Sequence, residues 1–175
     1  MLETKLKQTL RDVADFPKPG IIFKDITPVL KDPILCEEIT QALANQLEGI
    51  QIDAVAGIES RGFLFGLALA QALKVPFVPI RKAGKLPYKT IKQSYDLEYG
   101  SATLEVHQDA FMPGQNVLIH DDLLATGGTV VAASQLITQL NAKVAAYSFL
   151  ISLDFLNGKE RLSAFSEHTF SLINY

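Results

Sequence analysis

The pattern of apolar positions changes its rhythm along this chain. Near the N-terminus, five apolar side chains recur at the spacing of one helix face: Leu2, Leu6, Leu10, Val13 and Ala14. This spacing predicts an amphipathic helix over residues 2 to 14. A second helical pattern begins at Asp32 and Pro33, a capping residue followed by a proline at the first helical position, and it runs to about Leu47.

Beyond residue 50 the apolar positions form short, nearly continuous runs: DAVAGI (53–58), PFVPI (76–80), NVLIHD (116–121) and KVAAYSFLI (143–151). Helical patterns over residues 62–73 and 128–140 alternate with them. Strands that are apolar on both faces predict an α/β fold with a central, mostly parallel sheet flanked by helices. Ligands of such sheets bind beyond the carboxyl ends of the strands, so we expect site residues just after Ile58, Ile80, Asp121 and Ile151.

Two segments fit no regular element. Residues 16–30, FPKPGIIFKDITPVL, are punctuated by prolines and predict an irregular segment outside any regular sheet. We expect a small N-terminal hood over about residues 1–31, completed by C-terminal contributions. Residues 82–103 are polar and basic without a clear apolar stripe, which is typical of a mobile functional loop.

Composition narrows the classes of function. A chain of 175 residues predicts a single domain over residues 1–175. The net charge of −3 argues against a broad nucleic-acid-binding face. The single cysteine, Cys36, allows no intramolecular disulfide and suits a reducing compartment. Because the sequence contains neither a signal-peptide pattern nor a membrane-spanning stretch, we expect a cytoplasmic protein without a membrane partner.

One stretch, IHDDLLATGGT (119–129), combines a strand, two adjacent carboxylates and a small-residue turn that opens a helix. Backbone N–H groups at such a turn converge on an anion, so a phosphate-binding loop is expected at Ala125, Thr126, Gly127, Gly128 and Thr129. Neither a Walker loop nor a dinucleotide fingerprint fits these residues. Asp121 and Asp122 would repel a phosphate, and they suit hydroxyl donors such as those of a ribose.

The longer stretch VLIHDDLLATGGT resembles the phosphoribosyl-diphosphate (PRPP) signature of type I phosphoribosyltransferases, and its DDLLATGGT core resembles the adenine phosphoribosyltransferases in particular. Three more regions are similar to that family. FPKPGIIFKDITPVL resembles its base-binding segment, and GIESRGFLFG resembles its pyrophosphate loop. RKAGKLPYKT and YDLEYGSATLEV resemble the two halves of its mobile catalytic loop. The resemblance implies the type I phosphoribosyltransferase fold.

The resemblance also implies an activity, the transfer of the 5-phosphoribosyl group from PRPP to adenine, which gives AMP and pyrophosphate. Asp121 and Asp122 would hold the ribose hydroxyls and stabilise positive charge on the sugar, and residues 125–129 would hold the 5′-phosphate. Six residues would contact pyrophosphate: Glu59, Ser60, Arg61, Arg81, Lys82 and Lys85. In this family the bond that corresponds to Glu59–Ser60 is a non-proline cis peptide.

For the base, the resemblance implies that the Ile22 backbone reads its edge, Phe23 stacks on the ring and Leu153 covers the other face. Lys24 stands where the resemblance leads us to expect an arginine, and lysine lacks the planar fork of a guanidinium. Glu98 and Tyr99 match the catalytic loop, and Glu98 is the candidate acceptor of the N9 proton of adenine.

Magnesium is implied as the cofactor, bound mainly through PRPP or pyrophosphate, without a protein metal ligand. A homodimer is implied as well. His120 lies within a strand pattern and is expected to be packed rather than catalytic. Two alternatives stay open. The chain could be a phosphoribosyltransferase for xanthine or another 6-oxo purine, or a PRPP- or purine-sensing regulator with the same fold.

Overall fold

The structure, a computed structural model, describes residues 1–97 and 100–175. Its centre is a seven-stranded sheet in the order β5-β6-β4-β3-β7-β8-β9. Five of these strands run parallel: β3 (Ala54–Ile58), β4 (Phe77–Lys82), β7 (Asn116–Leu124), β8 (Lys143–Ser152) and β9 (Thr169–Asn174). β6 (Ser101–His107) pairs antiparallel with β4 on one side and with the edge strand β5 (Thr90–Asp96) on the other. The predicted α/β fold with a mostly parallel sheet is confirmed.

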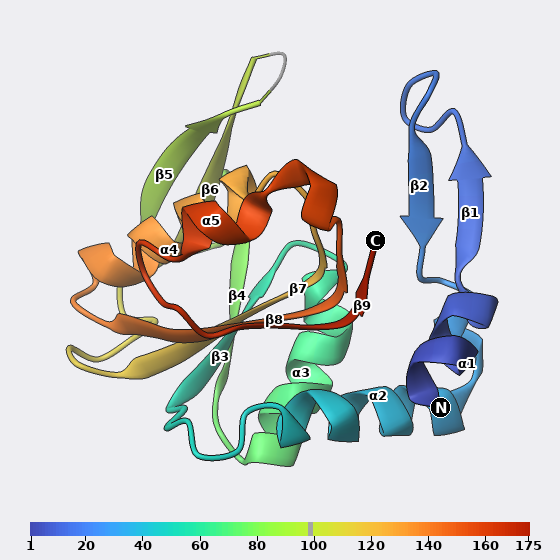
Figure 1. Ribbon diagram of the computed structural model, residues 1–175. Coiled ribbons are helices and arrows are strands. Elements are labelled where there is room, and N and C mark those ends of the chain that lie inside the picture. The colour runs from blue at the N-terminus through green and yellow to red at the C-terminus, as the bar shows by residue number, and fades with distance from the viewer. Residues whose placement is uncertain (98–99) are drawn as a thin grey trace.

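Helices cover both faces of the sheet (Figure 1). Helices α2 (Pro33–Asn45) and α3 (Gly62–Leu73) pack on one face, and α4 (Gly128–Gln139) and α5 (Gly158–Leu162) on the other. Two short 3-10 turns, η1 (Val29–Lys31) and η2 (Asp154–Leu156), complete the connections. Helix α2 begins as predicted, because the Asp32 side chain accepts a hydrogen bond from the Leu35 N–H at 3.0 Å and Pro33 occupies the first turn.

Alternation along the central strands divides the core into two apolar clusters. In β3 every residue is buried, with Val55 in the cluster under α2 and α3. Ala54, Ala56 and Ile58 belong instead to the cluster under α4. A strand buried on both faces cannot carry polar side chains along its length, so polar groups collect where the strands end.

The N-terminal region differs from the prediction in two ways. The first helix, α1 (Leu2–Thr9), ends before Leu10, and residues predicted as its continuation form strand β1 (Arg11–Ala14). β1 pairs antiparallel with β2 (Ile22–Asp25), so the predicted irregular hood contains a regular hairpin. The hairpin depends on hydrogen bonds between residues about ten positions apart, which a periodicity of side chains does not reveal.

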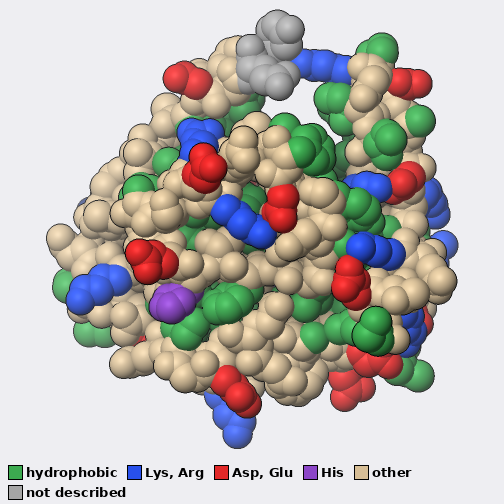
Figure 2. Space-filling view, viewed as in Figure 1, with side chains coloured by type: hydrophobic (Ala, Val, Ile, Leu, Met, Phe, Trp, Pro, Cys, Tyr) green, Lys and Arg blue, Asp and Glu red, His purple; other side chains and the backbone are tan. Residues whose placement is uncertain are grey.

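Residues 82–103, predicted to contain no regular element, hold all of β5 and the start of β6, and the mobility of this segment stays a prediction. The β5–β6 hairpin and the β1–β2 hairpin project on opposite sides of the sheet, as Figure 1 shows. The surface between them is hollowed, and acidic and basic side chains are interspersed over this face (Figure 2). In the described part of the chain, we find no helix of the length and apolar character that a membrane span requires.

Candidate functional site

The turn between β7 and α4 is shaped by two close backbone approaches. Gly127 adopts a left-handed conformation, with φ of 81° and ψ of −2°. A Cβ on Gly127 would lie 3.0 Å from the carbonyl oxygen of Gly158. A Cβ on Gly158 would in turn collide with the carbonyl oxygen of Ala125. Residues 125–129 are therefore wedged between the strand and the start of α5, with the first amides of α4 left free to bind an anion.

The two aspartates lie near the end of β7, beside the predicted phosphate-binding loop. Asp122 is almost fully buried, and its Oδ2 lies 2.7 Å from Nε of Arg61. Burial and the neighbouring Asp122 carboxylate raise the pKa of Asp121 well above its ordinary value. Burial also raises the pKa of Asp122, although the Arg61 guanidinium opposes that shift. The single Arg61 guanidinium does not fully offset the two negative charges of Asp121 and Asp122. Both carboxylates can therefore accept hydrogen bonds from neutral hydroxyls.

The loop after β3 is held against these carboxylates. The Glu59–Ser60 peptide is cis, as the resemblance implied. A Cβ on Gly62 would lie 2.8 Å from the carbonyl oxygen of His120 and 3.0 Å from Oδ1 of Asp121. Only glycine lets α3 start this close to β7, and that approach brings Arg61 to Asp122.

Glu59 gathers three of the predicted pyrophosphate ligands. Its carboxylate accepts the Lys82 N–H at 2.8 Å, lies 3.0 Å from Nζ of Lys85 and accepts Nε–H of Arg81 at 3.3 Å. Burial alone would raise the pKa of Glu59, but the Lys82 amide and the Lys85 ammonium lower it below its ordinary value. Glu59 was predicted to contact pyrophosphate. In the structure its carboxylate instead holds the side chains of Arg81 and Lys85 in place.

A second buried carboxylate, Glu105, fixes the segment that carries Lys85, and the sequence reasoning missed it. Glu105 in β6 is 1% exposed, and its Oε1 accepts the N–H groups of Lys85 and Leu86, each at 2.8 Å. Its Oε2 accepts the Thr90 hydroxyl at 3.3 Å. Burial would raise the pKa of Glu105, and these backbone donors lower it below the ordinary value. An acidic residue between Leu104 and Val106 in an apolar strand was the available signal.

Arg161 was missed as well. Its guanidinium donates a hydrogen bond to the carbonyl oxygen of Thr126 at 3.1 Å and lies 3.6 Å from a Cβ built on Gly128. Helix α5 thus contributes a cation at the phosphate-binding loop. No spacing in the sequence links Arg161 to residues 35 positions earlier, so only the fold reveals the contact.

These elements surround one cleft of about 520 Å³ at the carboxyl ends of the strands. Seven predicted site residues line it: Glu59, Ser60, Arg61, Lys82, Asp121, Asp122 and Thr129. Tyr95 and Leu97 of the β5 side line it too. Glu98 and Tyr99, predicted for the catalytic loop, lie outside the described residues.

The predicted base-binding residues lie on two separate segments. Phe23 in β2 packs edge-on against Phe16, with ring centroids 5.1 Å apart, and the Arg61 guanidinium lies 4.7 Å from its ring centroid. Ile22 is 58% exposed. Leu153 follows β8, and its N–H donates to the carbonyl oxygen of Leu124 at 2.9 Å. Arg61 therefore connects the phenylalanine to the carboxylate of Asp122.

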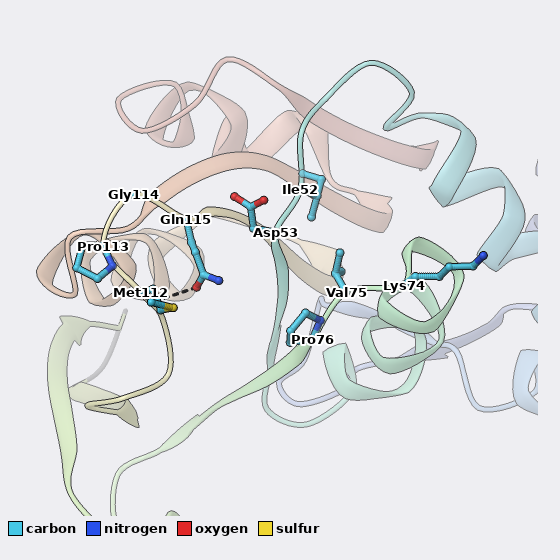
Figure 3. A pocket seen from close by; sticks show the side chains of 9 residues that line it. All are labelled: Ile52, Asp53, Lys74, Val75, Pro76, Met112, Pro113, Gly114 and Gln115. Atoms are coloured by element: carbon cyan, nitrogen blue, oxygen red, sulfur yellow. Dashed lines mark hydrogen bonds between the residues drawn. The ribbon is translucent and has the colours of Figure 1, made fainter.

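A second hollow, of about 630 Å³, lies at the opposite end of the strands, between the start of β3, the end of α3 and the turn before β7 (Figure 3). Its polar groups serve the local turns. Oε1 of Gln115 accepts the Met112 N–H at 2.9 Å, and Asp53 accepts the Asn116 N–H at 2.7 Å. Because parallel sheets bind ligands at the carboxyl ends of their strands, the smaller cleft is the candidate site.

His120 is packed, as predicted. It is completely buried, and desolvation lowers its pKa to about 3, so the imidazole is neutral at physiological pH. Across residues 1–97 and 100–175, no group of three or more His, Cys, Asp or Glu side chains is arranged to hold a metal ion.

Comparisons with known proteins agree with this geometry. The family model of the phosphoribosyl transferase domain matches residues 26–161. An adenine phosphoribosyltransferase from Cytophaga hutchinsonii is 56% identical over 175 residues, which cover 100% of this chain and 97% of that protein.

Solved structures give the same result. The adenine phosphoribosyltransferase from Thermoanaerobacter pseudethanolicus superposes with a TM-score of 0.95 at 48% identity, covering 99% of each chain. The enzyme from Saccharomyces cerevisiae, complexed with adenine and an imino-altritol bisphosphate, has a TM-score of 0.91 at 42% identity over 98% of each chain. The chain belongs to the adenine phosphoribosyltransferase family of type I phosphoribosyltransferases.

Proposed function

We propose that this chain transfers the 5-phosphoribosyl group of PRPP to N9 of adenine, giving AMP and pyrophosphate in purine salvage. One observation carries the proposal. The buried Asp122 carboxylate, the anion-binding turn at residues 125–129 and the Glu59 cluster of cations surround a single cleft. That order matches the ribose, the 5′-phosphate and the diphosphate of PRPP.

The proposal is tested by measuring PRPP-dependent turnover of adenine, hypoxanthine, guanine and xanthine. We expect kcat/KM for adenine to exceed the values for the three 6-oxo purines. A site built around a 6-amino donor leaves a buried group unpaired when a 6-oxo purine enters, which penalises the wrong base. Preferred use of xanthine would refute the adenine assignment, and binding of PRPP without turnover of any base would favour a sensor.

In the proposed complex the chain holds PRPP at three places. Residues 125–129 donate backbone N–H groups to the 5′-phosphate, with support from Arg161. Asp121 and Asp122 accept hydrogen bonds from the ribose hydroxyls. Their negative charge also stabilises the sugar as it becomes positive.

The bond between C1 of the ribose and the diphosphate oxygen breaks, and the bond between C1 and N9 forms. Arg61, Lys82 and Lys85 receive the negative charge of the departing pyrophosphate. The N9 proton passes to Glu98, a role that rests on the sequence motif alone. Tyr99 belongs to the same motif.

For the base, we propose that adenine lies between Phe23 and Leu153, with its edge along the backbone of Ile22. A purine stacked on an aromatic ring gains about 1–3 kcal/mol. In the structure, the Arg61 guanidinium lies 4.7 Å from the Phe23 ring centroid. Arg61 would have to turn toward the diphosphate before a base could use that face.

Magnesium is proposed to enter with PRPP, coordinated mainly by diphosphate oxygens, and its chemistry is to neutralise the diphosphate charge. Of the carboxylates that line the cleft, Glu59 is paired with Arg81 and Lys85, and Asp122 is paired with Arg61. Titrating the chain with Mg²⁺ in the presence and absence of PRPP tests this. Tight binding without PRPP would contradict it.

A homodimer is proposed from apolar side chains on α3 and beside it. Leu64 and Leu67 are 46% and 48% exposed, and Leu64 lines a hollow together with Leu30 and Phe65. Leu64→Glu is expected to shift the sedimentation coefficient to that of a monomer, and wild-type behaviour as a monomer would refute the dimer. The cytoplasmic location remains a prediction that cell fractionation tests.

A further inference from the structure

The ammonium group of Lys24, next to Phe23 in β2, has two partners. Its Nζ lies 2.8 and 2.9 Å from the two carboxylate oxygens of Asp12, the residue opposite Lys24 in the β1–β2 register. The same Nζ lies 4.2 Å from the ring centroid of Tyr175, within the range of a cation–π contact. The Lys24 side chain is only 13% exposed, whereas the Asp12 side chain is 58% exposed, so Lys24 lies under Asp12 at the surface.

Tyr175 is fixed to the segment that carries Leu153. Its N–H donates to the carbonyl oxygen of Ser152 at 2.9 Å, and its own carbonyl oxygen accepts the Asp154 N–H at 2.9 Å. Residues on both sides of Leu153 are therefore hydrogen-bonded to Tyr175. A movement of the Tyr175 ring would be transmitted to Leu153 through its backbone.

The β1–β2 hairpin is not held by burial of its own side chains. Residues 11–25 are all exposed or half-buried, and burial resumes only at Ile26. A hairpin of two short strands is marginally stable by itself, so side-chain contacts to the body decide its position. The cation–π contact between Lys24 and Tyr175 is one of these contacts. It links β2, which carries Phe23, to the segment that carries Leu153.

We infer that Lys24 and Tyr175 are positioning residues for adenine, which set the separation between Phe23 and Leu153 without touching the base themselves. The inference rests on the proposed function, since it assumes that adenine lies between these two side chains. It also gives Lys24 a task that a lysine can perform. A cation over an aromatic ring needs no planar fork, whereas a bidentate contact to a base edge does.

The test is a set of steady-state measurements in which adenine and PRPP are varied separately. Tyr175→Leu keeps an apolar side chain but removes the ring, and we expect it to raise KM for adenine about threefold to tenfold. KM for PRPP should stay within about twofold, because the phosphate-binding loop is formed by other elements. Tyr175→Phe keeps the ring and should restore the KM of the wild type.

A double-mutant cycle separates positioning from direct contact. If Lys24 acts through Tyr175, the variant with both Lys24→Met and Tyr175→Leu should be no worse than either single variant. If Lys24 contacts the base directly, the two effects multiply, and the inference is overturned. Lys7→Met is the matched control. Lys7 lies 5.6 Å from the same ring centroid but belongs to α1, so KM for adenine should not change.

Hydrogen exchange of the β2 amides gives a readout that does not depend on turnover. Tyr175→Leu should accelerate exchange in β2 relative to the wild type and leave β7 unchanged. Unchanged exchange together with an unchanged KM in a folded variant would refute the inference. If the wild type does not use adenine at all, the proposed function fails, and the exchange data still decide whether Tyr175 fixes the hairpin.

Discussion

The two halves of the proposed active site are built differently. The phosphoribosyl half follows β7 and enters α4 within a few residues, and its carboxylates and glycines pack directly on the buried core. The base half consists of a hairpin without a buried residue and of Leu153, about 130 positions further along the chain. The centre of the phosphoribosyl half is thus one short stretch packed on the core, whereas the base half is assembled from distant, partly exposed segments. Variants should therefore affect KM for one substrate and spare the other.

The largest effect should come from the chemical step, which neither half controls alone. Glu98→Gln removes the proposed proton acceptor, so we expect kcat to fall about hundredfold to ten-thousandfold. The affinity for PRPP, measured by direct binding, should remain near that of the wild type. Retained kcat would show that the N9 proton leaves by another route.

A large effect confined to the phosphoribosyl half is expected from Gly158→Ala. The added methyl group would collide with the carbonyl oxygen of Ala125 and displace the phosphate-binding loop. We expect KM for PRPP to rise about tenfold to hundredfold, because small displacements of a binding group are costly.

The matched control for Gly158→Ala is Gly49→Ala, where no heavy atom lies within 4 Å of the new Cβ. That control should change stability, since Gly49 has a φ of 80°, but not KM for PRPP. If Gly158→Ala raised KM for adenine as much as KM for PRPP, the two halves would not act separately.

A smaller effect, on KM for adenine, is expected from Phe23→Leu in the base half of the site. Leucine retains apolar volume but loses the stacking face, so KM for adenine should rise about fivefold to twentyfold. KM for PRPP serves as the internal control and should not move. A rise in KM for PRPP instead would mean that Phe23 acts through its contact with Arg61.

The smallest effect is a pH dependence of the phosphoribosyl half. The raised pKa of Asp121 means that its ionised form is present only above a pH higher than usual for an aspartate. Affinity for PRPP should therefore be lost as the pH falls through that raised pKa, with KM for PRPP rising about twofold to fivefold across the titration. Asp121→Asn should flatten this profile, which distinguishes the carboxylate from the titrating phosphate of PRPP.

Much of the phosphoribosyl half was predictable because its signals are local. The double aspartate, the glycine turn and the alternating strands are consecutive in the sequence, and the cis peptide at Glu59–Ser60 followed from the motif around it. Helix α3 was predicted with its observed bounds, Gly62–Leu73.

The remaining features were not predictable because their partners are distant. The β5–β6 hairpin escaped notice because Gln93 and Tyr95 on its inner face are polar and only half-buried. The first helix was extended too far because Leu10 and Val13 happened to continue its apolar spacing. Glu105 and Arg161 become meaningful only once the fold has brought their partners to them.

The cluster around Glu59 has a consequence for turnover. Arg81 and Lys85 share the Glu59 carboxylate as an internal counterion, at 3.3 and 3.0 Å, and the Lys82 amide donates to the same carboxylate. In the proposed reaction, pyrophosphate would compete with Glu59 for Arg81 and Lys85, and Glu59 would pair with both cations again once pyrophosphate departs. Such an internal counterion would lower the affinity for the product and so favour its release before the next cycle.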